Sequence, residues 1–463
     1  MTLPDPVESL FHEGTRQMTD GHAAAAEATF RRALLLDPDA AVVHANLGYL
    51  LDRAGRWHEA EQAYRNAIAR QPWQVQVQLN LGAMLAACRR FDAAESVYRE
   101  ALRTDPTRPA AWSNLGVLLA CTKRESEAEH CYRTAMTLDP AYRKAPFNLA
   151  YLLLRQGRYD EGWRRLEARE ACLPDEAFGV LPRWQGEPLH GKTLLIEFEA
   201  GHGDMIQFCR FARLAKERGA ARVSLLCHPA LQPLLGSAAG VDEAIAFDQP
   251  MPAIDWHYRV APMGMPRLFD TRLDSIPATL PYLEAPADRL HRWTQAFAAM
   301  EPGLRVGLVW KGNPRFENDG ERSLPSLDAL APLGEVAGVR FFSLQKGAGQ
   351  EQAAQPPAAL ALTDLAPHIA DFADTAAIVT QLDLVITVDT AVAHLAGALA
   401  KRCWMMLPDY KTDWRWMAER DDTPWYPSVM RLFRQGADAD WTPVIAAVKC
   451  ALQALVGDAG PFS

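Results

Sequence analysis

The sequence lacks several features that would place it in a special class. Its eight cysteines fall singly, with no CxxC pair and no histidine–cysteine cluster at zinc spacing, which argues against a disulfide framework or a zinc module. The longest apolar stretches, 382–388 and 391–400, are too short or too interrupted to span a bilayer. The N-terminal MTLPDPVESLFHEG has no basic leader followed by an apolar run. We therefore expect a cytoplasmic protein without a secretory signal.

An excess of positive charge is also missing. The formal net charge is -9, which argues against nucleic acid as the main partner, because such binders carry a basic face. A local basic patch can still hold a pyrophosphate. Hydrophobic residues make up 49% and charged residues 23%, so a buried core is expected. A length of 463 residues suggests roughly three domains.

The first third of the chain contains a gapless repeat of 34 residues, which predicts an α-solenoid. The repeats are 7–40, 41–74, 75–108, 109–142 and 143–176. The eighth position holds Gly14, Gly48, Gly82, Gly116 and Ala150, and the twentieth holds Ala26, Ala60, Ala94, Ala128 and Gly162. The twenty-fourth holds Phe30, Tyr64, Tyr98, Tyr132 and Leu166, and the thirty-second holds Pro38, Pro72, Pro106, Pro140 and Pro174. This is the tetratricopeptide pattern.

Each recurring residue has a physical role in a stack of helix pairs. Small residues allow the two helices of a repeat to approach, the ring fills the gap to the next repeat, and proline ends the second helix. Stacking buries apolar faces that one pair cannot bury alone. The fifth repeat departs from the pattern at Leu166 and Arg169. We expect it to cap the stack and dock on the next domain.

A row of amides is predicted along the inner surface of the stack. The sixth position of the later repeats is Asn46, Asn80, Asn114 and Asn148, whereas the first repeat has His12. An amide both donates and accepts, so such a row can pair with the backbone of any peptide. The row resembles the asparagine ladder of the O-GlcNAc transferase superhelix, which implies a protein acceptor. Asparagine is also common here in tetratricopeptide repeats, where it can bond within the repeat.

The rest of the chain alternates strand-like and helical patterns, which predicts α/β structure with parallel sheets. After a linker at 177–192, the candidate strands are 193–199, 222–227, 243–247, 257–260, 305–310, 340–344, 384–388, 403–407 and 430–433, with one helix at 287–300 between the two sets. Two doubly wound halves, 193–300 and 301–460, are the simplest arrangement, and ligands should bind beyond the carboxyl ends of their strands.

Three segments of this region resemble the heptosyltransferase-like GT-B glycosyltransferases. They are TLLIEFEAGHGDMIQFCRFARLAKERGA, RVGLVWKGNPRFENDGERSLP and DLVITVDTAVAHLAGALAKRCWMML. Together with the repeats, they resemble bacterial fusions of tetratricopeptide repeats with glycosyltransferases. The resemblance covers about residues 183–435. It implies a GT-B fold, with the first half on the acceptor side and the second half binding a nucleotide-sugar donor.

Asp204 is the candidate catalytic residue. It lies in the glycine-containing loop Gly201–His202–Gly203 that follows an apolar strand and opens a helix. The resemblance implies that this aspartate is the general base that takes a proton from the acceptor hydroxyl. The competing interpretation is a simple helix N-cap. His202 stands where the family more often has a leucine or tyrosine, so the resemblance implies no role for it, although its chemistry would allow a base.

The candidate donor site begins at Asp389, Thr390 and Ala391, which follow the run LVITV and start a helix that includes His394. A helix N-terminus favours an anion such as a diphosphate. The resemblance implies that Asp389 contacts the sugar, that Thr390 and nearby amides face the diphosphate, and that His394 lines the pocket. A cap with a core histidine is the alternative. Ala391 replaces a glycine of the family.

Further donor-side candidates follow other strands of the second half. Lys311 and Arg322 could neutralise a leaving nucleoside diphosphate, so no metal is expected, or they could be surface charges. Gln345 and Lys346 suit contacts with the nucleotide, and Asp371 and Asp374 could hold the base or ribose. The tryptophan-rich segment 413–428 is expected to pack rather than to form a sugar-stacking wall.

These observations favour a glycosyltransferase with no cofactor, which transfers a sugar to a protein threaded along the repeats. The resemblance implies that the reaction inverts the configuration at the anomeric carbon and needs no metal. Three alternatives stay open: a scaffold whose GT-B module is inactive, a sugar-nucleotide epimerase, and a lipopolysaccharide-type heptosyltransferase. The sugar, the nucleotide and the acceptor are not specified by the sequence, and self-association through the repeats is open.

Overall fold

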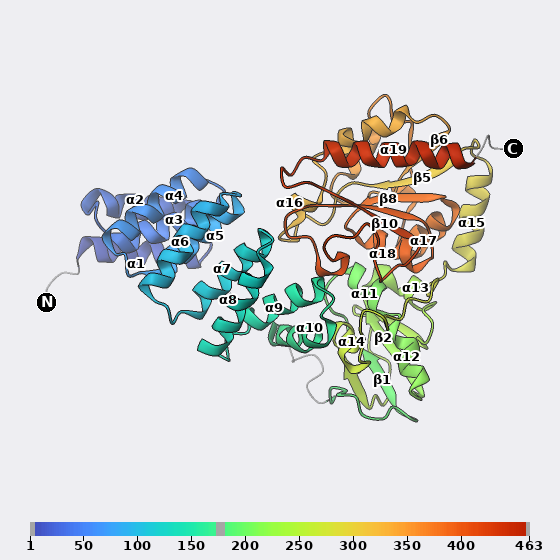
Figure 1. Cartoon of the computed structure of the whole chain (residues 1–463), viewed down its shortest axis with the longest axis horizontal. Coiled ribbons are helices and arrows are strands. Elements are labelled where there is room, and N and C mark those ends of the chain that lie inside the picture. The colour runs from blue at the N-terminus through green and yellow to red at the C-terminus, as the bar shows by residue number, and fades with distance from the viewer. Residues whose placement is uncertain (1–4, 173–180, 460–463) are drawn as a thin grey trace. The chain divides into compact units, whose positions relative to one another are not determined.

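The computed structural model of the chain, in which residues 5–172 and 181–459 are described, forms two compact units (Figure 1). The first comprises Met1–Leu152 with Ala168–Ala171, and the second comprises Leu153–Glu167 with Cys172–Ser463. Part of the segment 177–192, expected from the sequence to be a linker, lies outside the described residues.

The first unit is a stack of helix pairs that follows the 34-residue period. Its helices are α1 (Pro6–Thr19), α2 (Ala23–Leu36), α3 (Ala41–Arg53), α4 (Trp57–Arg70), α5 (Val75–Ala87), α6 (Phe91–Thr104), α7 (Pro109–Cys121), α8 (Glu125–Leu138) and, running on into the second unit, α9 (Lys144–Arg155). Proline stands in the first turn of α1 and of α7, where its missing N–H costs nothing.

The glycine of each helix pair is required by the ring of the same pair. A Cβ atom added at Gly48 would lie 2.7 Å from Cδ1 of Tyr64, and one at Gly116 would lie 2.6 Å from Cε1 of Tyr132. Carbon atoms in contact prefer a separation of about 3.5–4.0 Å, so only glycine lets the ring lie flat against the first helix. The ring therefore packs against the first helix of its own repeat, whereas from the sequence we expected it to fill the gap to the next repeat.

The last helix of the fifth repeat, α10 (Tyr159–Leu166), belongs to the second unit. The buried Trp163 donates from Nε1 to the carbonyl oxygen of Thr271 at 2.9 Å. Its ring meets Trp414 edge-on at 5.3 Å between centroids and Trp425 at 6.4 Å. Within the second unit, this helix packs against the α/β structure.

Two parallel sheets organise the second unit. The first has the order β3-β2-β1-β4 and the second β10-β9-β8-β5-β6-β7. The strands are β1 (Thr193–Ile196), β2 (Arg222–Cys227), β3 (Glu243–Ala246), β4 (Tyr258–Val260), β5 (Leu304–Val309), β6 (Val339–Ser343), β7 (Leu362–Asp364), β8 (Leu384–Val388), β9 (Cys403–Leu407) and β10 (Met430–Arg434). Their helices include α11 (His202–Phe208), α12 (Phe211–Glu217), α13 (Gln232–Leu235), α14 (Met265–Leu268), α15 (Ala287–Ala298), α16 (Asp319–Arg322), α17 (Phe372–Gln381), α18 (Ala391–Ala398) and α19 (Thr442–Ala459).

Both sheets are doubly wound, so each has a point where the strand order reverses. In the first sheet this point lies between β1 and β4, and in the second it lies between β5 and β8. Ligands of such sheets bind beyond the carboxyl ends of the strands at the reversal. The loops after β1, β5 and β8 are therefore where a site is expected.

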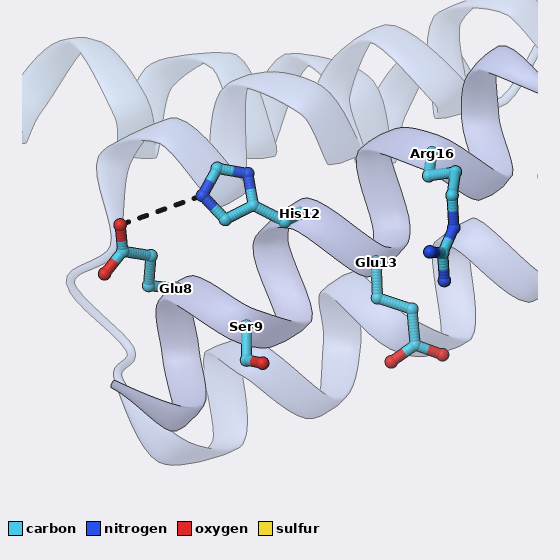
Figure 2. A pocket seen from close by; sticks show the side chains of 5 residues that line it. All are labelled: Glu8, Ser9, His12, Glu13 and Arg16. Carbon is cyan, nitrogen blue, oxygen red and sulfur yellow. Dashed lines mark ion pairs between the residues drawn. The ribbon is translucent and has the colours of Figure 1, made fainter. Parts of the chain in front are cut away.

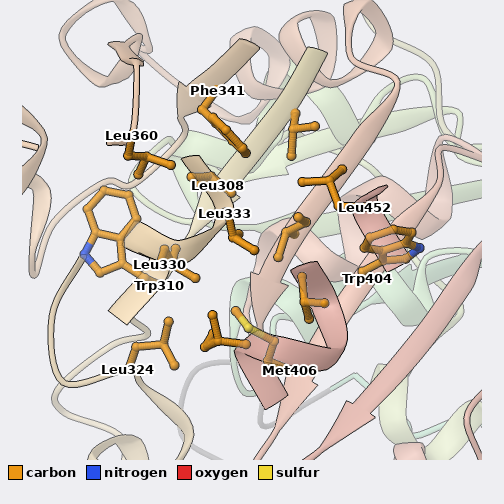
Figure 3. Packing of buried hydrophobic residues seen from close by; sticks show 14 of the residues in the cluster. Leu308, Trp310, Leu324, Leu330, Leu333, Phe341, Leu360, Trp404, Met406 and Leu452 are labelled. Atoms are coloured by element: carbon orange, nitrogen blue, oxygen red, sulfur yellow. The ribbon is translucent and has the colours of Figure 1, made fainter. Parts of the chain in front are cut away.

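The larger sheet is held by an apolar layer under α19 and the 3₁₀ segment Leu327–Glu335 (Figure 3). Side chains from alternate positions of β5 and β8 meet Leu330, Leu333 and Leu452 there. Burying one such leucine contributes about 1.5–3 kcal/mol. This layer covers one face of the sheet whose strand ends carry the loops of the expected site.

The nine predicted strands and the helix at 287–300 are all present, with ends shifted by at most a few residues. The structure adds β7, which the sequence pattern did not indicate. That strand is three residues long, pairs only with β6 among the described strands, and is followed by Pro367. Its residues are partly or fully exposed, so no run of apolar residues marked it.

Candidate functional site

The loop after β1 places Asp204 at the start of α11. Gly201 is the N-cap of this helix, and its backbone N–H donates to Oδ2 of Asp204 at 2.8 Å. Asp204 is therefore not the N-cap considered from the sequence: it is the third residue of the helix, and its carboxylate binds the backbone N–H of the N-cap. The cap leaves Oδ1 for another partner.

That partner comes from the other half of the unit. The guanidinium of Arg415, in the 3₁₀ segment Trp414–Trp416, forms an ion pair from Nη2 to Oδ1 of Asp204. Burial raises the pKa of Asp204; Arg415 and the Gly201 N–H oppose this, whereas Asp413 and Glu199 add to it. The carboxylate is thus held across the two lobes with both oxygens engaged.

The second candidate carboxylate, Asp389, lies at the carboxyl end of β8, and Thr390 is the N-cap of α18. Trp416 donates from Nε1 to Oδ2 of Asp389 at 2.9 Å. Burial and the nearby Asp413 raise the pKa of Asp389, against the smaller effect of the Trp416 bond and two arginines. Asp204 and Asp389, from different lobes, therefore contact adjacent residues of one short segment.

The starts of α11 and α18 approach closely. A Cβ atom at Gly203 would lie 2.7 Å from Cδ2 of His394 and 3.5 Å from the Cα atom of Ala391. Only glycine fits at this crossing. The two helix starts named by the sequence motifs therefore face each other across the lobes.

His394 is buried at this crossing. Its Nδ1 lies 2.9 Å from the hydroxyl of Tyr426, and its ring lies 5.3 Å from that of Trp416. Burial, together with nearby arginines, holds the pKa of His394 well below its usual value. The imidazole is therefore neutral near pH 7, and it can offer one N–H as a hydrogen-bond donor.

The candidate cations and Gln345 are engaged with the protein. Lys311 donates from Nζ to the carbonyl oxygens of Leu324 and Pro325, and Lys346 does so to that of Ala366. Arg322 pairs with Asp319 at 3.0 Å. Gln345 bonds the backbone of Lys311 in both directions, which ties the ends of β5 and β6 together. A pocket of about 370 Å³ beside these strand ends includes Lys311 in its lining.

Asp371 and Asp374 lie at the start of α17 and have structural partners. Asp371 caps the helix by accepting from the N–H groups of Ala373 and Asp374. The carboxylate of Asp374 is fully buried and accepts from both Arg289 and Arg292 of α15. These bonds fix α17 against α15.

His202 lies among other rings rather than beside Asp204. Its ring is 4.6 Å from His228 and 5.2 Å from Phe372. Burial and His228 lower the pKa of His202. His202 therefore packs against the rings of His228 and Phe372.

The asparagines of the repeats are half-buried, and the bonds they make are mostly to neighbouring helices of the stack. Asn46 donates to Oγ1 of Thr15 at 3.3 Å, and Asn148 donates to Oγ of Ser113 at 3.2 Å. Oδ1 of Asn80 accepts from Gln76 of its own helix at 3.0 Å. Bonding within the stack is thus one use of these amides. Figure 2 shows His12, which takes the equivalent place on α1, in a hollow with Glu8 and Arg16.

Sequence reasoning missed Arg415 and Tyr426 as site residues. The tryptophan-rich segment does pack, as expected, since Trp414, Trp416, Trp425 and Tyr426 are all buried. Arg415 lies 211 positions from Asp204, and no spacing rule joins them. The one usable signal was a single arginine between two tryptophans.

No group of three or more histidine, cysteine, aspartate or glutamate side chains in residues 5–172 and 181–459 is arranged to hold a metal ion. Within the same ranges, none of the helices has both the length and the apolar character needed to cross a membrane.

Two family models match segments of the chain, one in the repeats and one in the α/β region. Residues 12–74, 45–109, 85–129 and 124–163 match the tetratricopeptide repeat model. Residues 328–403 match the model of glycosyltransferase family 9 (heptosyltransferase). The chain therefore combines tetratricopeptide repeats with a glycosyltransferase family 9 region.

Individual proteins are similar over parts of the chain. Protein FlbA of Caulobacter vibrioides is 28% identical over 325 residues, which cover 65% of this chain and 53% of FlbA. The chain thus spans about half the length of that curated relative. Among solved structures, PilF of Pseudomonas aeruginosa is 19% identical with a TM-score of 0.36, covering 46% of this chain and 86% of its own. A thermophilic tetratricopeptide repeat protein of Thermus thermophilus is 23% identical with a TM-score of 0.31, covering 35% and 90%.

Proposed function

We propose that this chain is a glycosyltransferase that moves a sugar from a nucleotide-sugar donor to a protein held along its tetratricopeptide repeats. The observation that carries the proposal is the meeting of Asp204 and Asp389 at one segment, 413–416. Each carboxylate stands at a helix start, and the strands before them, β1 and β8, border the reversal points of their sheets. This is where doubly wound sheets bind ligands.

In the proposed reaction, Asp204 acts as the general base. The acceptor hydroxyl oxygen attacks the anomeric carbon of the donor, and its proton passes to the carboxylate of Asp204. The bond from the anomeric carbon to the diphosphate oxygen breaks with inversion, and the nucleoside diphosphate leaves. The N–H groups at the start of α18 and the N–H of the neutral His394 would stabilise the negative charge of the leaving group without a metal.

The substrate sides follow the two lobes. The acceptor is proposed to lie near the loop Gly201–Gly203, and the donor near Asp389, Thr390 and Ala391. The nucleotide of the donor is proposed to bind beside residues that hold the strand ends and the start of α17 in place. These residues are Lys311, Arg322, Gln345, Lys346, Asp371 and Asp374. The protein acceptor is proposed because the repeats keep four half-buried asparagines in register.

The test is release of nucleoside diphosphate from a panel of nucleotide sugars, with and without an added protein acceptor. Asp204→Asn should reduce transfer by roughly 10²–10⁴-fold, the usual contribution of general base catalysis. Asp288→Asn, an exposed carboxylate on α15, is the matched control and should leave the rate unchanged. If no nucleotide sugar binds, the chain is a scaffold. Isomerised donor without transfer would identify an epimerase.

The repeats have a separate test. Changing both Asn80 and Asn114 to alanine should weaken glycosylation of the protein acceptor, because amides that pair with its backbone are lost. Donor hydrolysis should be unchanged. Equal loss of both activities would contradict a role of the repeats in holding the acceptor, and transfer to a saccharide acceptor alone would favour the lipopolysaccharide-type reaction.

A further inference from the structure

We propose that Arg415 is a positioning residue that orients the carboxylate of Asp204 across the two lobes and keeps it ready to accept a proton. The inference rests on the proposed function, because Asp204 needs orienting only if it is the general base. It assigns a role to a residue outside the motifs that carry the family resemblance.

All three nitrogens of the Arg415 guanidinium are engaged. Nη2 pairs with Asp204, Nη1 lies 3.0 Å from Oδ1 of Asp413, and Nε donates to Oε1 of Gln207. Asp204 and Gln207 are both on α11, so one planar fork joins this helix to the segment 413–416. A guanidinium is preorganised for such multiple bonds, whereas an ammonium is a point charge.

The arginine itself is held in place. Only 5% of Arg415 is exposed, and its guanidinium carbon lies 4.5 Å from the ring centroid of Trp414 and 5.4 Å from that of Phe208. Its backbone N–H donates to Asp413 at 3.0 Å, which also fixes the turn. The side chain therefore has little freedom to swing away from Asp204.

The two bonds to Asp204 come from opposite ends of its carboxylate. The Gly201 N–H binds Oδ2 and Arg415 binds Oδ1, so the plane of the group cannot rotate. Each oxygen still has a second lone pair for a substrate hydroxyl. Proton transfer requires this geometry, since a base must lie within hydrogen-bond reach of the proton it takes.

The charges around Asp204 show why a cation is needed. Glu199, Asp413 and Asp389 place negative charge near the site from the loop after β1, from the segment 413–416 and from the end of β8. His394, which meets the loop from α18, is neutral because its pKa is lowered. Of the groups that lower the pKa of Asp204 against burial, Arg415 has the largest effect, so it favours the ionised base.

The experiment is the pH dependence of kcat/KM for donor and acceptor in the full chain. The base works when ionised, so activity falls as the pH drops through the pKa of Asp204. Arg415→Gln should move this acid limb to higher pH by about one unit or more, with an added fall in kcat from lost orientation. Arg415→Lys keeps the positive charge, so its acid limb should lie closer to that of the wild type. Its kcat should recover less, because an ammonium cannot form the same set of bonds.

Two further variants make the test specific. Asp413→Asn removes a negative charge but keeps an acceptor for the Arg415 N–H, so the acid limb should move to lower pH. Arg420, five residues after Arg415, pairs with Asp422 at the surface. Arg420→Gln should change neither the acid limb nor the rate. Opposite shifts from neighbouring residues are not expected from a merely structural role.

The outcomes separate the two proposals. An active wild-type protein whose Arg415→Gln variant loses rate but keeps its acid limb would overturn the positioning role alone. A wild-type protein that acts on no nucleotide sugar would overturn the proposed function and this inference with it. If Arg415→Gln does not fold, as judged by circular dichroism, the lysine and Asp413→Asn variants decide: an unmoved acid limb in both would overturn the role.

Discussion

The repeat unit and the α/β unit differ in how far apart in the sequence their contacting residues lie. In the repeats, a ring lies over the glycine of the same helix pair, as Tyr132 does over Gly116, and ion pairs such as Arg56–Glu27 join residues 29 positions apart. In the α/β unit, Arg415 meets Asp204 over 211 positions and Arg210 meets the carbonyl of Trp425 over 215. Contacts that repeat locally build a surface, whereas contacts between distant segments build a site.

The comparison also explains where charge is placed. The repeats carry arginine–glutamate pairs between neighbouring helix pairs, in which the arginine is the more exposed partner and the glutamate is partly buried, and water screens such pairs in part. The α/β unit instead brings Asp204, Asp389, Asp413 and Arg415 together in a largely buried place, so the pKa values of Asp204 and Asp389 shift. Perturbed carboxylates of this kind are typical of functional sites.

The largest effect is expected at α10, which lies in the fifth repeat of the sequence but belongs to the second unit of the structure. Trp163→Ala removes a buried ring of α10 and its bond to Thr271, which should lower the free energy of unfolding of the α/β unit by about 3–5 kcal/mol. Urea unfolding of the full chain, followed by tryptophan fluorescence and circular dichroism, measures it. Trp73→Ala, which is 66% exposed, is the control. A loss confined to the repeat transition would show that α10 belongs with the repeats.

A smaller effect should be confined to the repeats. Gly116→Ala places a Cβ atom against the Tyr132 ring, and such overpacking should cost about 1–3 kcal/mol in the repeat transition. The α/β transition should be unchanged. Gly457→Ala, where an added Cβ meets open space, serves as the control. Simultaneous loss in both transitions would mean that the two units unfold together.

The next change sharpens the contrast in charge. Burial raises the pKa of Asp389 to about 6 in the folded chain, above its value in the unfolded chain. Stability is therefore lost as the pH rises toward and past about 6, because the carboxylate must ionise in a buried place. Asp389→Asn should therefore raise the unfolding free energy of the α/β unit on the order of 1 kcal/mol at pH 8. The gain should shrink toward pH 5, where the native carboxyl is protonated, and donor binding should weaken. Unfolding in urea at both pH values tests the sign; a gain that grows in acid would contradict it.

The smallest effect is expected on the surface of the repeats. Arg90→Gln breaks the pair with Glu61 between two repeats. The midpoint of thermal unfolding should fall slightly at low ionic strength and should approach that of the wild type in concentrated salt, because salt screens a pair whose arginine is exposed. A decrease that persists in salt would show that packing of the arginine stem, rather than its charge, is responsible.

Much of this architecture was predictable from patterns. The 34-residue period located the helix pairs, and apolar runs located nine strands. Asp204, Thr390 and their helix starts followed from the change of pattern at the strand ends. Gln345, Asp371 and Asp374 were placed at the right element ends, but their bonds to Lys311, to the start of α17 and to the arginines of α15 were not foreseeable. β7 escaped because a short, exposed edge strand leaves no periodic signal.

By itself, the sequence determined which segments are helices and strands, how the repeats stack and which residues stand at helix starts, because these depend on neighbours within a few positions. Only the tertiary structure decided that Arg415 faces Asp204, that Trp416 binds Asp389 and that Tyr426 holds His394. Ionisation and orientation depend on burial and on charges contributed by distant segments, and these exist only once the two lobes have packed together.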